Sequence, residues 1–271
     1  MTAETGLGGP LERRTGWCGI AMVSVIVANA ALSLAWGSIP DSWGAEARAD
    51  LAEFLTDPSN LDRALALFAF STLIFVFGIG FFAGLRRLSD MWDPGGWTSG
   101  VVTIGAALFL AGGLVSETLH TGTLVAVRST PSYEPDANGL LLLQSLWPAA
   151  LAQAQLGLGV VVVALSIGAR RARALPTWIT GLGLVAGSLA IVRPAVVSQV
   201  PLFIALFVPT FVWLASIGVV LIRRGSASSM PGTPHNPTYL DALDANPEQP
   251  PSVAGGPPHF TTGMNAEAEV R

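Results

Sequence analysis

Six apolar stretches, each about as long as a bilayer is thick, constrain this chain more than any other feature of its sequence. A helix needs about 20 consecutive apolar residues to cross the hydrocarbon core. Backbone groups in lipid must bond within the spanning structure, and the runs lack the alternation of barrel strands, so helices are expected. The charge-free runs lie at 16–36, 64–85, 97–115, within 140–168, at 175–192 and at 200–222.

The predicted fold class is therefore all-α, a polytopic membrane helix bundle with six transmembrane helices. Residues 1–15 are expected to form a cytoplasmic segment, residues 16–224 the transmembrane domain, and residues 225–271 a disordered cytoplasmic tail. The tail holds eight of the 19 prolines and few aromatic residues. Such a composition cannot bury enough apolar surface to offset the entropy of ordering.

Charge excludes several classes of protein. Only 12% of the residues are charged, about half of the soluble average, and the net charge is -4. A soluble globule and a basic nucleic-acid binder are both excluded. The single cysteine, Cys18, rules out an internal disulfide framework. No phosphate-binding loop or hydrolase motif occurs, so no cofactor is expected, and an enzyme is the less favoured interpretation.

The arginines predict an orientation, because cytoplasmic loops are enriched in basic residues. Nine arginines fall on one side of a six-span arrangement and four on the other, where most of the loop acids also lie. The expected topology is therefore N-in and C-in. The nine are Arg13, Arg14, Arg86, Arg87, Arg170, Arg171, Arg173, Arg223 and Arg224, and the four are Arg48, Arg63, Arg128 and Arg193.

The first apolar run has an alternative interpretation as a cleaved signal peptide. Arg13 and Arg14 precede it, and Ala28-Asn29-Ala30 resembles a small-residue cleavage site. The run continues to Trp36, however, which gives it the full length of a membrane span. A membrane helix is therefore favoured over cleavage.

Two irregular features are expected outside or between the spans. Residues 45–55 carry apolar side chains at helical spacing among acids, so a short amphipathic helix packed on the protein is expected. Asp57 and Pro58 then predict a cap leading into the second span. Pro148 interrupts the fourth run, and residues 140–146 are expected to form a short tilted or re-entrant piece, because proline kinks a helix.

Glu117 and His120 are the first candidate site residues. Three residues apart on a helix they share a face, and Glu-x-x-His occurs in carboxylate-bridged metal sites of helix bundles. Such sites need further ligands, and His120 is the only histidine outside the tail, so no metal site is predicted. The alternative is that both side chains lie at the outer interface, where polar groups cost little.

Arg193 and Gln153 complete the candidate ligand- or ion-binding residues. Arg193 ends the fifth run, where it is expected to pair with Glu117, bind an anionic solute or extend to lipid head groups. Gln153 and Gln155 are two residues apart and cannot both face one partner. The pairs Gly80/Gly84 and Gly183/Gly187 predict close helix packing, within the bundle or between subunits.

The layout resembles that of the uncharacterised six-helix membrane proteins of GC-rich bacteria. The likeness rests on the arginine pair before the first span, Gly-Leu-Arg-Arg-Leu-Ser at 84–89 and Gly-Gly-Trp-Thr-Ser at 95–99. It covers residues 11–224 and implies no activity.

The sequence leaves three functions open. The first is a non-enzymatic integral protein of the cell membrane, in bacteria the inner membrane, whose loops or tail dock a partner protein. The second is a small-solute transporter or channel, and the third a membrane-embedded metal enzyme. The lipid bilayer is the one certain environment, a homo-oligomer is compatible with the glycine pairs, and nucleic acid is not an expected partner.

Overall fold

The structure is a computed structural model that describes residues 8–37, 39–40, 46–130, 132, 137–196 and 205–227. Within these residues the chain is all-helical, and six helices are long and apolar enough to cross a membrane. The predicted helix bundle with six membrane-spanning helices is confirmed. The tail predicted for residues 225–271 lies, beyond Ala227, outside the described residues. The helices are α1 (Gly8–Trp36), α2 (Ala47–Thr56), α3 (Pro58–Trp92), α4 (Thr98–Ser129), α5 (Ala137–Arg171), α6 (Thr177–Val192) and α8 (Val208–Ala227), with a 3₁₀ turn η1 (Arg193–Val196) after α6.

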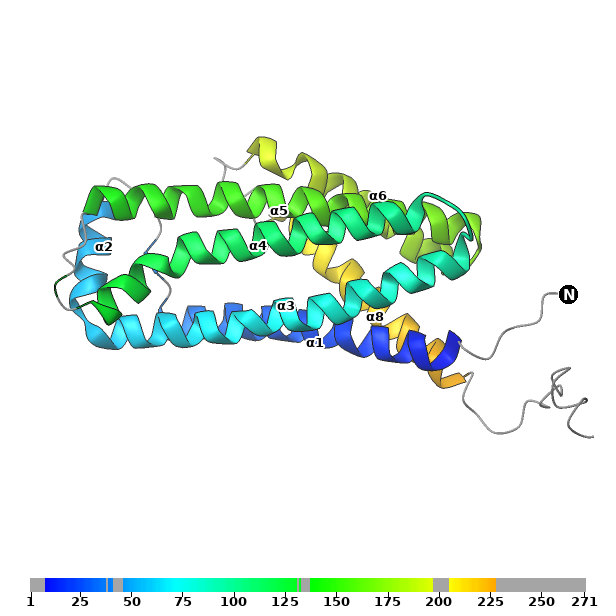
Figure 1. Cartoon of the computed structure of the whole chain (residues 1–271), viewed down its shortest axis with the longest axis horizontal. Coiled ribbons are helices and arrows are strands. Elements are labelled where there is room, and N and C mark those ends of the chain that lie inside the picture. The colour runs from blue at the N-terminus through cyan, green and yellow to red at the C-terminus, as the bar shows by residue number, and fades with distance from the viewer. Residues whose placement is uncertain are drawn as a thin grey trace, which may run out of the picture. The chain divides into compact units, whose positions relative to one another are not determined.

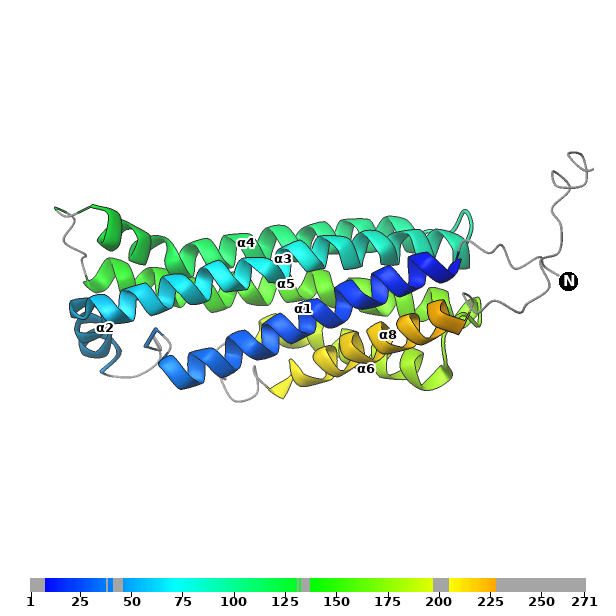
Figure 2. The ribbon, with the colours of Figure 1, turned by 90° about the horizontal axis from the view of Figure 1, so that it is seen from below.

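The six long helices pack in a closed ring. Helices consecutive in the chain contact each other in the order α1, α3, α4, α5, α6 and α8, and α8 returns to pack along α1. Figures 1 and 2 show these neighbours running antiparallel, with α1 and α8 side by side. Every long helix contributes buried side chains to one apolar core. Met22, Phe81, Leu165 and Trp213 are among its largest fully buried members.

Glycines set the spacing of the ring. Gly80 and Gly84 of α3 face α1, where an added Cβ would contact Cys18 and overlap with Thr15. Both glycine pairs predicted as packing sites lie between helices of this one chain, since Gly187 of α6 faces α5 in the same way. Small residues permit such backbone approach in membrane bundles, where dispersion and polar contacts drive association.

At the seam between α1 and α8 the two backbones come into close contact. A Cβ on Gly16 would lie 2.6 Å from the carbonyl oxygen of Gly218, and one on Gly218 would lie 3.2 Å from that of Gly16. Any larger residue at Gly16 would force the two helices apart. The first and the last spans are therefore fitted to each other.

The three longest helices extend well beyond the thickness of a bilayer. At 1.5 Å per residue, α3 and α5 with 35 residues each and α4 with 32 reach about 50 Å, whereas the hydrocarbon core is about 30 Å thick. The predicted spans were shorter than these helices because only their apolar parts were counted. The excess of α3 and α5 supports α2, which packs against both and lies at one end of the bundle (Figure 1).

The short amphipathic helix is confirmed as α2. Leu51 is 2% exposed and belongs, with Ile39, Leu61 and Leu124, to a second apolar cluster at this end of the bundle. The acidic residues of α2 are exposed, for example Asp50 and Glu53. The helix thus buries its apolar face on protein, as its acidic face led us to expect.

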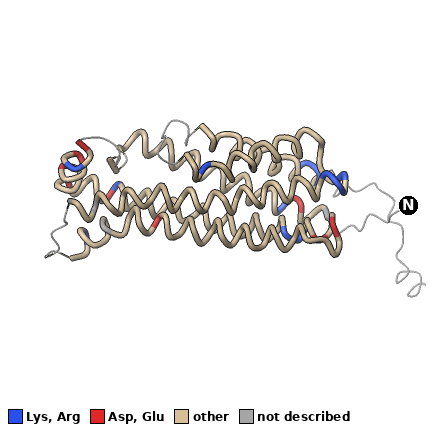
Figure 3. The backbone as a smooth tube through the Cα atoms, turned by 90° about the horizontal axis from the view of Figure 1, so that it is seen from above, with Lys and Arg blue, Asp and Glu red and all other residues tan. Residues whose placement is uncertain are grey.

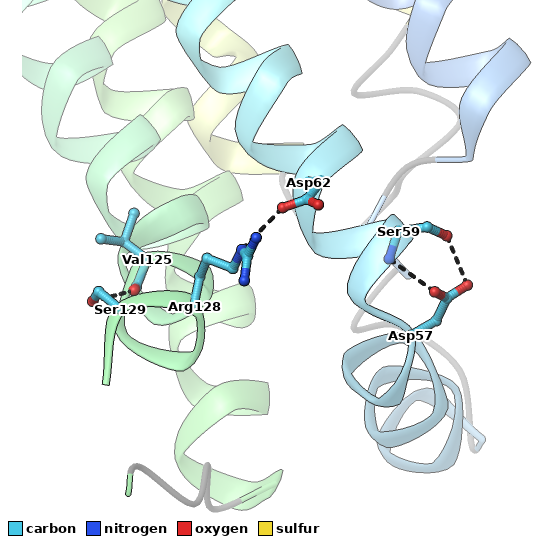
Figure 4. Close-up of polar contacts among 6 residues, drawn as sticks. All are labelled: Asp57, Ser59, Asp62, Val125, Arg128 and Ser129. Atoms are coloured by element: carbon cyan, nitrogen blue, oxygen red, sulfur yellow. Dashed lines mark hydrogen bonds and ion pairs between the residues drawn. The ribbon is translucent and has the colours of Figure 1, made fainter. Parts of the chain in front are cut away.

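The cap at the start of α3 is also confirmed. Asp57 accepts hydrogen bonds from the Ser59 backbone nitrogen at 2.8 Å and from the Ser59 hydroxyl at 2.9 Å (Figure 4). These bonds lower the pKa of the exposed Asp57 carboxyl from its usual value, because they favour the ionised form. Close by, Arg128 Nε lies 3.0 Å from Asp62 Oδ1 and ties α4 to α3.

The re-entrant piece expected before Pro148 is wrong, because α5 continues through the proline as a single helix. Proline provides no N–H for the carbonyl of Gln144, four residues earlier. Neighbouring helices can support a bundle helix at such a point. Here the backbone carbonyl of Trp147 accepts a hydrogen bond from the Ser116 hydroxyl of α4 at 3.3 Å, and the Gln144 side chain also bonds to α4.

Basic residues gather at one end of the bundle, where some acidic residues also lie (Figure 3). The start of α1 and the ends of α3, α5 and α8 meet at one end, which we call the arginine-rich end, and Figure 3 shows basic residues gathered there. The acidic α2 lies at the opposite end, here called the α2 end. This grouping fits the six-span arrangement, whereas N-in and C-in stays a prediction.

Candidate functional site

A pair of hydrogen bonds joins His120 of α4 to Gln144 of α5. His120 Nδ1 and Gln144 Oε1 lie 3.0 Å apart, and Gln144 Nε2 donates to the His120 carbonyl oxygen, also at 3.0 Å. Since the amide nitrogen serves the carbonyl, the amide oxygen accepts from Nδ1, which fixes the proton on that ring nitrogen. Gln144 is 5% exposed. One glutamine thus holds both the ring and the backbone of His120.

An aromatic ring supports the same histidine. The His120 and Trp147 rings lie with their centroids 4.7 Å apart and their planes 32° apart. Trp147 stands three residues after Gln144 and so occupies the same face of α5. The His120 ring is therefore held by a hydrogen bond and by ring contact from one helix.

Glu117 belongs to a different contact. Its Oε2 accepts a hydrogen bond from the Ser71 hydroxyl of α3 at 3.3 Å, and that hydroxyl also lies 2.8 Å from the Phe68 carbonyl oxygen. Glu117 thus bonds to α3, whereas His120 bonds to α5. Although the two residues share one side of α4, their side chains bond to different neighbouring helices. The Glu-x-x-His pair therefore does not form a common site.

The geometry leaves the metal-enzyme hypothesis without support. In the part of the chain that the structure describes, no three His, Cys, Asp or Glu side chains gather as metal ligands would. The acids considered as further ligands, Glu134 and Asp136, lie outside the described residues. Carboxylate-bridged sites in bundles draw ligands from several helices onto one point, and Glu117 and His120 do not converge.

Arg193 lies away from both residues. It opens η1 at the end of α6, is 3% exposed, and places its guanidinium carbon 4.0 Å from the centre of the Phe207 ring. Glu117 has no contact with it, so the expected pair across the outer face does not form. An arginine over an aromatic face gains electrostatic attraction that grows as water is excluded. The side chain is therefore enclosed by protein rather than extended to head groups.

The glutamines of α5 divide as their spacing predicts. Gln153 is exposed on the outer surface of the helix, while Gln155 is 1% exposed. The Gln155 Oε1 atom has no hydrogen-bond partner in the described structure. The structure thus brings Gln153 together with none of the other candidates, and Gln155 is the buried amide of the two.

Sequence reasoning missed Ser71, Trp147 and Phe207, which contact Glu117, His120 and Arg193. A weak signal for one of them, Trp147, existed in the register of α4 with α5. In the antiparallel pair α4 and α5, contacting residue numbers add to about 264, as in His120 with Gln144 and Ser116 with Trp147. One known contact would have predicted the next, but the sequence supplies no first contact.

No family model matches the chain, and neither a curated protein nor a solved structure matches it. The fold and the contacts described above are therefore the basis on which a function is proposed.

Proposed function

We propose that this chain is a non-enzymatic component of a cell membrane that serves as a structural or interaction protein. Six apolar helices fit a multi-pass membrane protein. The observation that supports the finer proposal is that polar side chains within the bundle join neighbouring helices to each other. His120 with Gln144 and Glu117 with Ser71 are such pairs, each linking helices adjacent in the ring.

Tight packing supports the same proposal. At the seam of α4 and α5, a Cβ on Gly105 would lie 2.8 Å from the Gly157 carbonyl oxygen. At the seam of α5 and α6, a Cβ on Gly159 would lie 2.7 Å from the Gly187 carbonyl oxygen. Helices in such contact are suited to a fixed scaffold, because sliding one helix past the other would break the close backbone contacts at the glycines.

A scaffold acts through what it presents, and the proposed docking segment is the Pro-rich tail. Its composition predicts a chain that stays extended until a partner orders it. We place it in the cytoplasm, beneath the bacterial inner membrane, because the arginine-rich end precedes it and basic residues mark that side.

The test compares three proteins expressed in the native host: the full chain, the chain ended after Ala227, and the full chain with residues 228–271 shuffled. Chemical cross-linking in cells followed by mass spectrometry identifies neighbours of each. We expect a defined protein neighbour that is lost from the truncated and the shuffled chain alike. The shuffled tail keeps composition and length, so identical neighbours for all three proteins would contradict docking through the tail.

A second function, transport of a small anion, is favoured by the burial of Arg193. This residue falls within a candidate span, Thr177–Val196, and a buried arginine there is costly enough to suggest a role. Purified chain in liposomes loaded with chloride tests it by electrode-detected efflux. A transporter would release chloride faster than empty liposomes, and R193Q would abolish this while R128Q, at an exposed arginine, would not. Efflux equal to that of empty liposomes would eliminate chloride transport and leave the scaffold proposal standing.

A further inference from the structure

A hollow of about 410 Å³ opens at the arginine-rich end, between the first turns of α1 and the last turns of α8. We call it the α1–α8 hollow. It is lined by Pro10, Arg13, Arg14 and Trp17 from α1 and by Gly225 from α8. Two arginines and a tryptophan thus line a concave surface at the arginine-rich end of the bundle.

Backbone packing creates this hollow. A Cβ on Gly225 would overlap with the Gly9 carbonyl oxygen and would lie 2.7 Å from the Arg13 nitrogen. Position 225 is therefore confined to a residue without a side chain. The close packing of α8 on α1 places Gly225 beside the arginines of α1 in the lining of the hollow.

The two arginines keep their charges available. Both are exposed, and neither forms an ion pair or side-chain hydrogen bond within the described residues. The carboxylate next to them in sequence, Glu12, is directed elsewhere, since Arg224 Nε lies 3.8 Å from its Oε1. Guanidiniums bind phosphate oxygens in pairs of parallel hydrogen bonds. Both arginines line the hollow, so it presents two positive charges to an anion bound there.

Trp17 adds a membrane signature. Its side chain is 55% exposed, and tryptophan at a bilayer interface sits at head-group level. Beyond it, exposed apolar residues such as Val27 continue along α1. A ligand with a phosphate at one end and hydrocarbon at the other would contact the arginines, Trp17 and the exposed apolar residues of α1 in turn. Free phosphate would contact only the arginines.

We propose that the α1–α8 hollow binds the phosphate of an anionic phospholipid, with Arg13 and Arg14 on the phosphate oxygens and Trp17 beside the glycerol region. Basic pockets between helices at a membrane face are suited to such head groups. A zwitterionic lipid carries a cationic group beside its phosphate and gains less from two arginines. The site requires a chain in a bilayer and holds for either function considered above.

The experiment is native mass spectrometry of the full chain in detergent, titrated with phosphatidylglycerol or phosphatidylcholine. A matched control exists in Arg86 and Arg87, an exposed arginine pair at the same end of the bundle but outside the hollow. R13Q/R14Q and R86Q/R87Q remove the same charge. Each basic residue near an anionic lipid contributes about fivefold in affinity, so the hollow variant should bind phosphatidylglycerol about 25-fold more weakly.

We expect R86Q/R87Q to bind phosphatidylglycerol like the unaltered chain and phosphatidylcholine to bind weakly to all. Equal losses in both variants would overturn the site and leave only a diffuse field. Displacement of the lipid by millimolar inorganic phosphate would overturn the assignment to a lipid. If R13Q/R14Q does not fold, the single variants R13Q and R14Q are each expected to lose about fivefold, and no loss from either would also refute the proposal.

Discussion

Replacing Gln144 with leucine tests whether the contact with His120 is a structural link between α4 and α5. The change removes two hydrogen bonds of 3.0 Å from a side chain that is 5% exposed. Interhelical bonds in membrane bundles contribute about 0.6 to 1.7 kcal/mol each. Q144L should therefore lower the free energy of unfolding by about 1 to 3 kcal/mol. Titration with SDS in mixed micelles, followed by circular dichroism, measures it.

Gln153 provides the control on the same helix. It is exposed, so Q153L removes an amide without breaking a link between helices and should change stability by less than about 0.5 kcal/mol. The double variant H120L/Q144L replaces both partners with apolar groups and should cost less than the sum of its single changes, by about 1 kcal/mol or more. A Q144L effect no larger than that of Q153L, or strictly additive single changes, would refute the structural link.

Three further predictions concern the seams, the cap and the topology. G183A should lower the free energy of unfolding in detergent by about 1 to 3 kcal/mol, because the added Cβ would overlap with Ser166 Oγ and Trp213 Nε1. The control G181A places a Cβ where no atom lies within 4 Å, so its free energy of unfolding should be unchanged or higher. D57A should speed hydrogen exchange at the start of α3. The same loss of protection, measured as the exchange rate relative to the intrinsic rate at each pH, should appear in the unaltered chain as pH falls, because the lowered pKa means that the cap persists above the unfolded value near 4 and is lost only below it. An alkaline phosphatase fusion, active only outside the cytoplasm, should be active between α2 and α3 and inactive after residue 271; the reverse pattern would overturn the N-in and C-in prediction.

The membrane architecture followed from the sequence because its cause is local. Each span needs only its own apolar residues, so all six were predicted. The ends of α3 and α5 were missed because the helices continue on protein contacts after the apolar run stops. The break predicted before Pro148 was wrong for the same reason. The hydrogen bonds to α5 at this point come from Ser116 and other groups of α4, and the sequence of α5 alone does not predict them.

The candidate site shows more clearly what could not be predicted from the sequence. The spacing of Glu117 and His120 correctly placed them on one side of a helix, but their roles depend on which neighbour each meets. Ser71 and Gln144 lie 46 and 24 residues away in sequence. Those distances reflect the order and register of the ring, and the register is set by glycine contacts that form only when the helices pack. The sequence predicts which polar side chains lie in apolar helices, where burial is unfavourable. Helix packing determines which hydrogen-bond partner offsets that unfavourable burial.

The seam between Gly16 and Gly218 has a consequence for biosynthesis. Of the six long helices described, the two that close the ring are the first and the last to be made, and about 190 residues separate the end of α1 at Trp36 from the end of α8 at Ala227. At about 5 to 20 residues per second, α1 waits in the membrane for about 10 to 40 s before α8 exists. During that time the face of α1 that carries Gly16 has no α8 to pack against. Closure of the ring is thus the final step of assembly, and in a crowded membrane the waiting α1 of one chain can receive the α8 of another.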